Sequence, residues 1–269
     1  MTTLQKVIKY LAMAFAVFLT VSIISGILSA VGLLGGLFSS DAVLEDAKTY
    51  SVNAKIHNLD ITINAADLLI KEGEAFSVES NLQNLKVEEK DGLLTIEETK
   101  KFAGTYTGAV LTVYVPAGTV FDNVNLITGA GRLTIGKLSA GTLDFVLGAG
   151  DVFIDSLVAT KSADIEGGAG RITISGGTLK DLELEMGVGQ LNLTSVLTGD
   201  CTMDLGIGES NLTLMGNKDD YQLDLNKGIG NISVDGKNVS DYGSSGNGTN
   251  TVEINGGVGS IHVKFNDAG

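Results

Sequence analysis

The fold is decided by a short glycine-centred pattern, of which residues 143–154, LDFVLGAGDVFI, are the clearest copy. Apolar residues recur at every second position on both sides of Gly148-Ala149-Gly150, and a period of two is typical of a strand with one buried face. The same Gly-apolar-Gly tripeptide occurs seven times in the chain; the other copies begin at Gly129, Gly168, Gly187, Gly206, Gly228 and Gly257. The pattern therefore predicts pairs of short strands, each pair joined by a glycine corner.

Successive tripeptides are 19, 20, 19, 19, 22 and 29 residues apart, so the period is nearly constant until the last two units. A unit of this length (a rung) cannot bury its apolar face alone, whereas rungs stacked about 4.8 Å apart share one interior. Glycine suits such corners because neighbouring backbones approach closely there and φ can be positive. We therefore expect an all-β fold, a parallel β-solenoid-like stack of rungs of 19–20 residues, over residues 124–265.

The segment before the stack, residues 50–123, is rich in alternating strands but lacks the glycine tripeptide. We interpret it as an N-terminal cap of the same β domain that blocks end-to-end pairing of strands. Lys90-Asp91-Gly92 predicts a hairpin turn within it. Residues 236–250 are the largest break in the period and fit either a flexible insertion or a partner-binding loop, and residues 266–269 form a short tail.

The N-terminal segment is chemically different, because no charged residue occurs from Tyr10 to Ser40. A membrane span needs about 20 apolar residues, so residues 10–38 predict a transmembrane signal-anchor helix, with a cleaved signal peptide as the alternative. Lys6 and Lys9 precede the span, which places residues 1–9 in the cytoplasm. Residues 39–49 then form a stalk, and the β domain lies outside the cytoplasm on a single-pass protein of the cell membrane.

The charge balance excludes several classes of protein. Beyond Lys6 and Lys9 the chain holds 16 basic and 32 acidic residues, a net charge of −16, and nucleic-acid binding needs a basic surface instead. Cys201 is the sole cysteine, which excludes a disulfide scaffold, and its place in the alternation predicts a small buried side chain.

Acidic residues recur at one outward position of the rungs. In-register stacking would place Asp144, Asp164 and Glu183 in one column, about 4.8 Å apart. Such a column is either a solvated acidic face or a weak divalent-cation site, since oxygen ligands suit Ca²⁺. No other metal or cofactor is expected.

Nothing in the sequence predicts a catalytic site. The glycine tripeptides lack the third glycine and the following helix of a dinucleotide-binding motif. The two histidines, His57 and His262, are expected at opposite ends of the stack. A glycan-active β-helix enzyme is the remaining alternative, but the tyrosines are scattered and the chain has no Trp to form a platform for sugar rings.

One known family resembles this pattern. The stretches VYVPAG at residues 113–118 and FDNVNL at residues 121–126, followed by Gly-Ala-Gly repeats, resemble the putative-adhesin, or toast-rack, β-strand repeat family of bacterial envelope proteins. The resemblance implies a setting at the cell envelope, often with a membrane anchor and in some members a link to envelope-stress signalling. It implies no catalytic residue.

Together these observations predict a membrane-anchored extracytoplasmic β-repeat protein that is not an enzyme. Its role would be structural, adhesin-like or interactive, through an unidentified protein or cell-envelope partner, with envelope-stress sensing as one form of that role. A divalent-cation or ligand-sensing module is the first alternative, and the glycan-active enzyme is the second.

Overall fold

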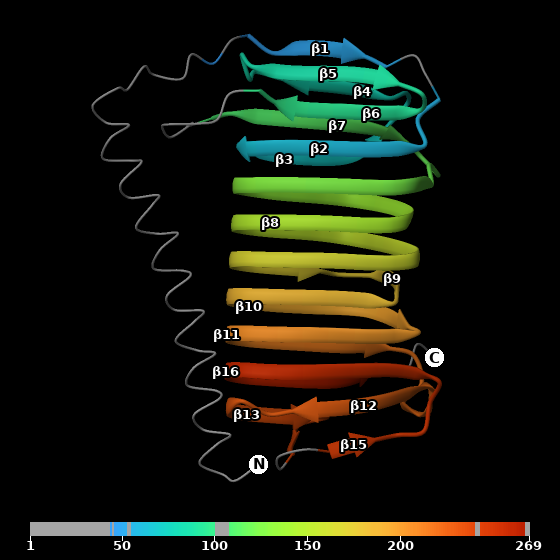
Figure 1. Ribbon diagram of the computed structural model, residues 1–269, viewed down its shortest axis with the longest axis vertical. Helices are drawn as coiled ribbons and strands as arrows, with labels where there is room; N and C mark the ends of the chain where they lie inside the picture. The colour runs from blue at the N-terminus through green and yellow to red at the C-terminus, as the bar shows by residue number, and fades with distance from the viewer. Residues whose placement is uncertain (1–43, 45, 53–54, 100–107, 240–242, 267–269) are drawn as a thin grey trace, which may run out of the picture.

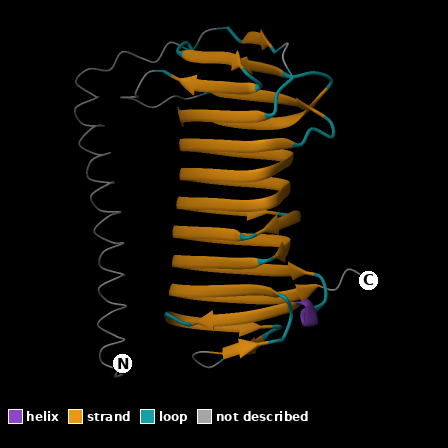
Figure 2. Cartoon of the chain, turned by 45° about the vertical axis from the view of Figure 1, so that its right-hand side comes forward, coloured by secondary structure: helices purple, strands orange, loops and turns teal. Residues whose placement is uncertain are grey.

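Each glycine-cornered unit folds as one turn of a flattened coil, and the turns stack along the long axis of the molecule (Figure 1). The computed structural model describes residues 44, 46–52, 55–99, 108–239 and 243–266. The longest element, β8 (Phe121–Ile174), contains three of the glycine tripeptides and winds continuously through the middle of the stack. The all-β prediction is confirmed, and the only helical element among the described residues is the short 3-10 turn η1 (Lys218–Asp220), visible in Figure 2.

The rungs stack in parallel and in register, as the repeat predicts. In β10 (Leu182–Thr198), Gly189 pairs with Gly170 of β8 on one side. On the other side it pairs with Gly208 of β11 (Asp200–Met215). A short strand, β9 (Gly177–Lys180), pairs with both β8 and β10 and continues the wall of the coil beyond the two main strands.

The interior is a continuous apolar column, because every second residue of each rung points inward. The inward residues of successive rungs are almost fully buried; examples are Phe145, Ile165, Leu184, Met203 and Ile254, each at most 1% exposed. Cys201 belongs to this column at 2% exposure, which confirms its predicted burial. Burial also raises the pKa of its thiol.

The order of rungs at the C-terminal end differs from the chain order. The last strand, β16 (Asn250–Asn266), lies between β11 and the pair formed by β12 (Tyr221–Asn226) and β13 (Ile229–Val234). Figure 1 shows this red strand inserted between two orange rungs. His262, which is expected at one end of the stack, therefore lies one rung inside that end, because β12 and β13 form the outer rung.

The N-terminal end repeats this arrangement. The strands β2 (Asn58–Ala65) and β3 (Asp67–Gly73) form a rung that pairs in register with the start of β8. The later strands β6 (Leu93–Glu98) and β7 (Val110–Pro116) form the next rung outward. At both ends, therefore, a rung is inserted between the body of the stack and an outer rung.

Short antiparallel strands cover the outer edges, which would otherwise offer unpaired backbone groups to another chain. At the N-terminal end β5 (Leu85–Lys90) pairs with β6, and β4 (Ser77–Ser80) pairs with β7 and with β1 (Lys48–Ser51). At the C-terminal end β14 (Lys237–Asn238) pairs with β13, and β15 (Gly243–Ser245) with β12. Asp91 and Gly92, with φ values of +50° and +77°, form the predicted hairpin turn between β5 and β6.

A buried carboxylate lies beside the corner between β2 and β3 near the N-terminal end. Glu98 is 4% exposed, and its Oε2 accepts hydrogen bonds from the backbone N–H groups of Asn64 at 2.8 Å and Ala65 at 3.4 Å. These N–H groups belong to the corner between β2 and β3. The Glu98 side chain thus supplies the acceptor that a neighbouring backbone would otherwise provide.

In the part of the chain that the structure describes, no helix has the length and apolar character needed to cross a bilayer. The predicted membrane helix over residues 10–38 and the predicted cytoplasmic residues 1–9 lie outside the described residues.

Candidate interaction surfaces

The glycine corners form one straight edge of the stack. At Gly189 and Gly208 φ is +144° and +146°. A Cβ at Gly208 would overlap the carbonyl oxygen of Gly189 in the neighbouring rung, and a Cβ at Gly189 would overlap that of Gly170. Two columns of glycine therefore run along the edge, and the middle residue of each tripeptide is the only one that carries a side chain.

These middle side chains point outward and grow larger toward the C-terminal end. Ala130, Ala149 and Ala169 are exposed in the first half of the edge. The second half carries four larger residues in adjacent rungs, which we call the aliphatic ridge: Val188, Ile207, Val258 and Ile229. Ile207 is 36% exposed and Ile229 is 54% exposed, although most large apolar side chains of the stack are buried.

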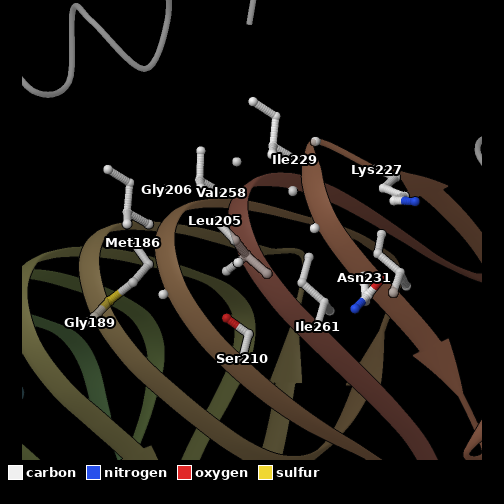
Figure 3. A pocket seen from close by; sticks show the side chains of 18 residues that line it. Met186, Gly189, Leu205, Gly206, Ser210, Lys227, Ile229, Asn231, Val258 and Ile261 are labelled. Atoms are coloured by element: carbon white, nitrogen blue, oxygen red, sulfur yellow. The ribbon is translucent and has the colours of Figure 1, made fainter. Parts of the chain in front are cut away.

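The ridge borders an open groove lined largely by glycine backbone. Figure 3 shows Val258 and Ile229 projecting away from the ribbon, whereas Leu205 and Ile261 lie beneath it and belong to the core. Because the flanking positions carry no side chains, a bound group could approach the backbone on either side of the ridge. The groove is a surface feature and encloses no catalytic group.

Carboxylates border the ridge. Glu185 and Asp204 each precede a ridge residue by three positions, and Glu209 follows Ile207 by two. Among the described residues the ion pairs are Lys86–Glu88, Arg171–Asp151 and Lys218–Asp235, so none of these three carboxylates takes part in one. Burial raises the pKa of Glu185 most, and the neighbouring charge of Asp204 adds to the rise.

The predicted acidic column is present on the strands that precede the glycine corners. Asp164 and Glu183 are register partners, and the charges of Glu183 and Asp144 both act on Asp164. The pKa of Asp164 is raised, chiefly by burial and then by these two neighbours. In the described parts of the chain no three His, Cys, Asp or Glu side chains converge as metal ligands would. The cation site at Asp144, Asp164 and Glu183 therefore stays a prediction.

The opposite face of the stack is polar rather than acidic. Asn211 Nδ2 donates to Asn192 Oδ1 at 3.1 Å, and Asn192 Nδ2 donates to Thr173 Oγ1 at 3.5 Å, so a ladder of side chains crosses three rungs. Farther along this column the Ser233 hydroxyl lies 2.8 Å from His262 Nδ1. These contacts satisfy polar groups between rungs and need no ligand.

The two histidines lie apart. His57 packs beside Gly92 near the N-terminal end, whereas Ser233 and His262 belong to the C-terminal rungs. Tyr221 is 2% exposed and donates its hydroxyl to the carbonyl oxygen of Met215 at 2.6 Å, so it offers no platform to a sugar.

Residues 236–250, which interrupt the repeat, contribute β14 and β15 to the C-terminal edge, and residues 240–242 are not described. Sequence reasoning missed the aliphatic ridge, although the increase from Ala to Val and Ile in the middle of the tripeptides was a readable signal.

Comparison with solved structures finds matches of low sequence identity. A putative adhesin from Bacteroides fragilis is 14% identical, covering 81% of this chain and 95% of its own, with a TM-score of 0.46. A putative cell adhesion protein from Clostridium sporogenes is 16% identical, covering 82% and 99%, with a TM-score of 0.39. A putative lipid binding protein from Parabacteroides distasonis is 13% identical, covering 81% and 96%, with a TM-score of 0.41.

No curated protein matches the sequence. The model of the Toastrack DUF4097 family matches residues 56–264, which span all the rungs of the stack. This match confirms the resemblance indicated by the glycine repeats and the strands before them. The chain belongs to the Toastrack DUF4097 family.

Proposed function

We propose that this protein is a membrane-anchored interaction module of the bacterial cell envelope and not an enzyme. The observation that carries the proposal is the aliphatic ridge, a line of four apolar side chains along the edge of the stack, of which Ile207 and Ile229 are exposed and Val188 and Val258 are half-buried. Exposed apolar side chains gathered in one place are typical of binding surfaces. Such a module would serve adhesion or the sensing of envelope stress, depending on the partner.

The membrane anchor in this proposal is the uncharged segment of residues 10–38. The acidic part of the chain beyond the anchor, residues 39–269, then lies outside the cytoplasm, where its net charge of −16 keeps it away from anionic headgroups. Deletion of residues 10–38 should move the protein from the membrane fraction to the soluble fraction. External protease should digest the β domain in intact spheroplasts and spare a tag placed before Lys6. Protection of the β domain would overturn this orientation.

Site-specific photocrosslinking tests the binding surface. A photoreactive amino acid at position 207 of the full-length protein, in its own membranes, should give crosslinked products. The same group at position 127 is the matched control, because Ile127 is 38% exposed and Ile207 is 36% exposed. Products of equal yield at both positions, or none at any of the four ridge positions, would overturn the interaction role.

The acidic column carries a second candidate function, the sensing of divalent cations. The observation in its favour is the effect of the Glu183 and Asp144 charges on the neighbouring Asp164, because a bound cation would offset this repulsion. Calorimetry with Ca²⁺ should give a heat and a raised melting temperature at millimolar concentration, and Asp164→Asn should weaken both. Absence of heat and of a melting shift would remove this function.

A further inference from the structure

The dimensions of the aliphatic ridge limit what can cover it. Its four residues come from β10, β11, β16 and β13, which are adjacent in this order. Neighbouring strands lie about 4.8 Å apart, so the ridge is about 14 Å long. A strip this narrow buries far less than the roughly 800 Å² per partner of a stable dimer interface. A slender partner, such as one helix, suits it better than a second folded domain.

The charges beside the ridge indicate which sign of charge a partner should carry. Glu185 and Asp204 lie on one side and Glu209 on the other. No basic side chain among the described residues forms an ion pair with them. Asp204 accepts a hydrogen bond from Asn255 Nδ2 at 2.8 Å, and Glu209 accepts one from Asn211 Nδ2 at 3.0 Å, so neutral amide groups hold both carboxylates in place. Against these three carboxylates, the lining of the groove includes one basic residue, Lys227.

We propose that the aliphatic ridge is a docking site for a cationic amphipathic helix of a partner protein. This inference rests on the proposed interaction function and names the class of partner. The apolar stripe of the helix would pack on Val188, Ile207, Val258 and Ile229, and its Lys or Arg side chains would reach the carboxylates on both sides. About ten helical residues span 14 Å, and the 5.4 Å pitch is close to the spacing between rungs.

Charge complementarity favours a cationic helix over two other possible occupants of the ridge, a second copy of the chain and an anionic bilayer. A second copy of the chain would bring the same carboxylates and a net charge of −14 toward the ridge. An anionic bilayer would be repelled for the same reason. A cationic helix is instead attracted, because the net negative charge of the domain raises its rate of encounter.

The test uses the full chain in nanodiscs of phosphatidylcholine, with empty nanodiscs measured in parallel. The probe is a fluorescent 14-residue synthetic helix with Leu at positions i, i+3, i+4 and i+7 and Lys beside them. A second peptide carries Glu in place of every Lys. Fluorescence anisotropy should show binding of the Lys peptide, weaker at high salt, and no binding of the Glu peptide.

Variants of the protein then locate the site. Ile207→Ser with Ile229→Ser should weaken binding of the Lys peptide by about tenfold or more, because the apolar contact is lost. Ile127→Ser, at an equally exposed position elsewhere, should leave affinity unchanged. Glu185→Gln with Asp204→Asn should weaken binding by about fivefold and reduce its salt dependence. Unchanged urea midpoints would show that the variants remain folded.

Three results would overturn the inference. The first is equal affinity of the protein for the Lys peptide and the Glu peptide. The second is equal affinity of the serine variant and the unchanged protein for the Lys peptide. The third is self-association of the unchanged protein that is lost in the serine variant. The last result would assign the ridge to a second copy. If no Lys peptide binds while photocrosslinking at position 207 still captures a partner, the class of partner is wrong and the proposed function stands. If crosslinking at the ridge also fails, both are wrong.

Discussion

The glycine corners allow a direct test of the stacking, and Gly208 is the most informative position. Its φ is +146°, and a Cβ there would overlap the carbonyl oxygen of Gly189. Gly208→Ala therefore faces two costs. A side chain in this region of φ costs about 1–3 kcal/mol. The displaced carbonyl weakens backbone hydrogen bonds between two rungs, at about 1 kcal/mol each. We expect a loss of about 4 kcal/mol in the free energy of unfolding.

Two other glycines separate these costs. Gly118 has a φ of +75°, and a Cβ added there would meet no other atom within 4 Å, so Gly118→Ala should cost about 1–2 kcal/mol from backbone conformation alone. Gly136 has no positive φ, and its added Cβ would meet the carbonyl oxygen of Ile70 at an ordinary 3.9 Å. Gly136→Ala should therefore leave stability unchanged or raise it by about 0.5 kcal/mol.

Urea denaturation followed by circular dichroism measures all three variants. We expect the midpoint to fall by more than about 1 M for Gly208→Ala and by less for Gly118→Ala. The m-value also matters, because a stack of repeats can lose cooperativity when one interface weakens. If Gly208→Ala is no less stable than Gly118→Ala, close approach of the backbones does not hold the stack together.

Three further predictions concern other parts of the stack. Tyr221→Phe removes the donor to the carbonyl oxygen of Met215 and the acceptor of the Leu197 N–H, and should lower the free energy of unfolding by about 1–2 kcal/mol in urea titrations; an unchanged midpoint would contradict these bonds. Cys201 should resist maleimide until the protein unfolds, because burial raises its pKa and blocks access; rapid native labelling would refute this. The pKa of Glu185 is raised in the folded protein, so its contribution to stability is fully present below the ordinary pKa of 4.5 and is lost as the pH rises through the folded-state pKa. Glu185→Gln should therefore flatten the dependence of the melting temperature on pH in melts from pH 3 to 7.

The stack and its columns could be predicted from sequence because a constant period fixes both the pairing register of the strands and which side chains point inward. With Gly170, Gly189 and Gly208 aligned, the inward place of Cys201 and the outward column of Asp164 and Glu183 follow directly. The N-terminal rung was hidden because Asn64 and Ala66 take the places of the two glycines. A side chain is tolerated at that corner because the group beyond it is the Glu98 carboxylate rather than another tightly packed backbone corner.

The rung order at the C-terminal end could not be read from the period. The units around Gly228 and Gly257 have the same tripeptide and the same alternation, so either could stack on the rung of Gly206. Which of the two units stacks there depends on the segments that connect the strands. Residues 216–220 carry the chain past the rung that β16 forms, and the Tyr221 hydroxyl donates to the carbonyl oxygen of Met215 across that rung. These are tertiary contacts, for which the local pattern gives no signal.

Stacking explains the glycines of each tripeptide but not the residue between them. Ala130, Ala149 and Ala169 show that a methyl group suffices at the corner, since the rungs of β8 stack as closely as those beyond them. The larger side chains at this position therefore add apolar surface that the stack buries only in part: Val188 and Val258 are half-buried, and Ile207 and Ile229 are exposed. The exposed part gains little from folding, because it remains in contact with water. Binding is the process in which burying it would contribute free energy, and this places the working surface of the molecule on the edge where its rungs turn.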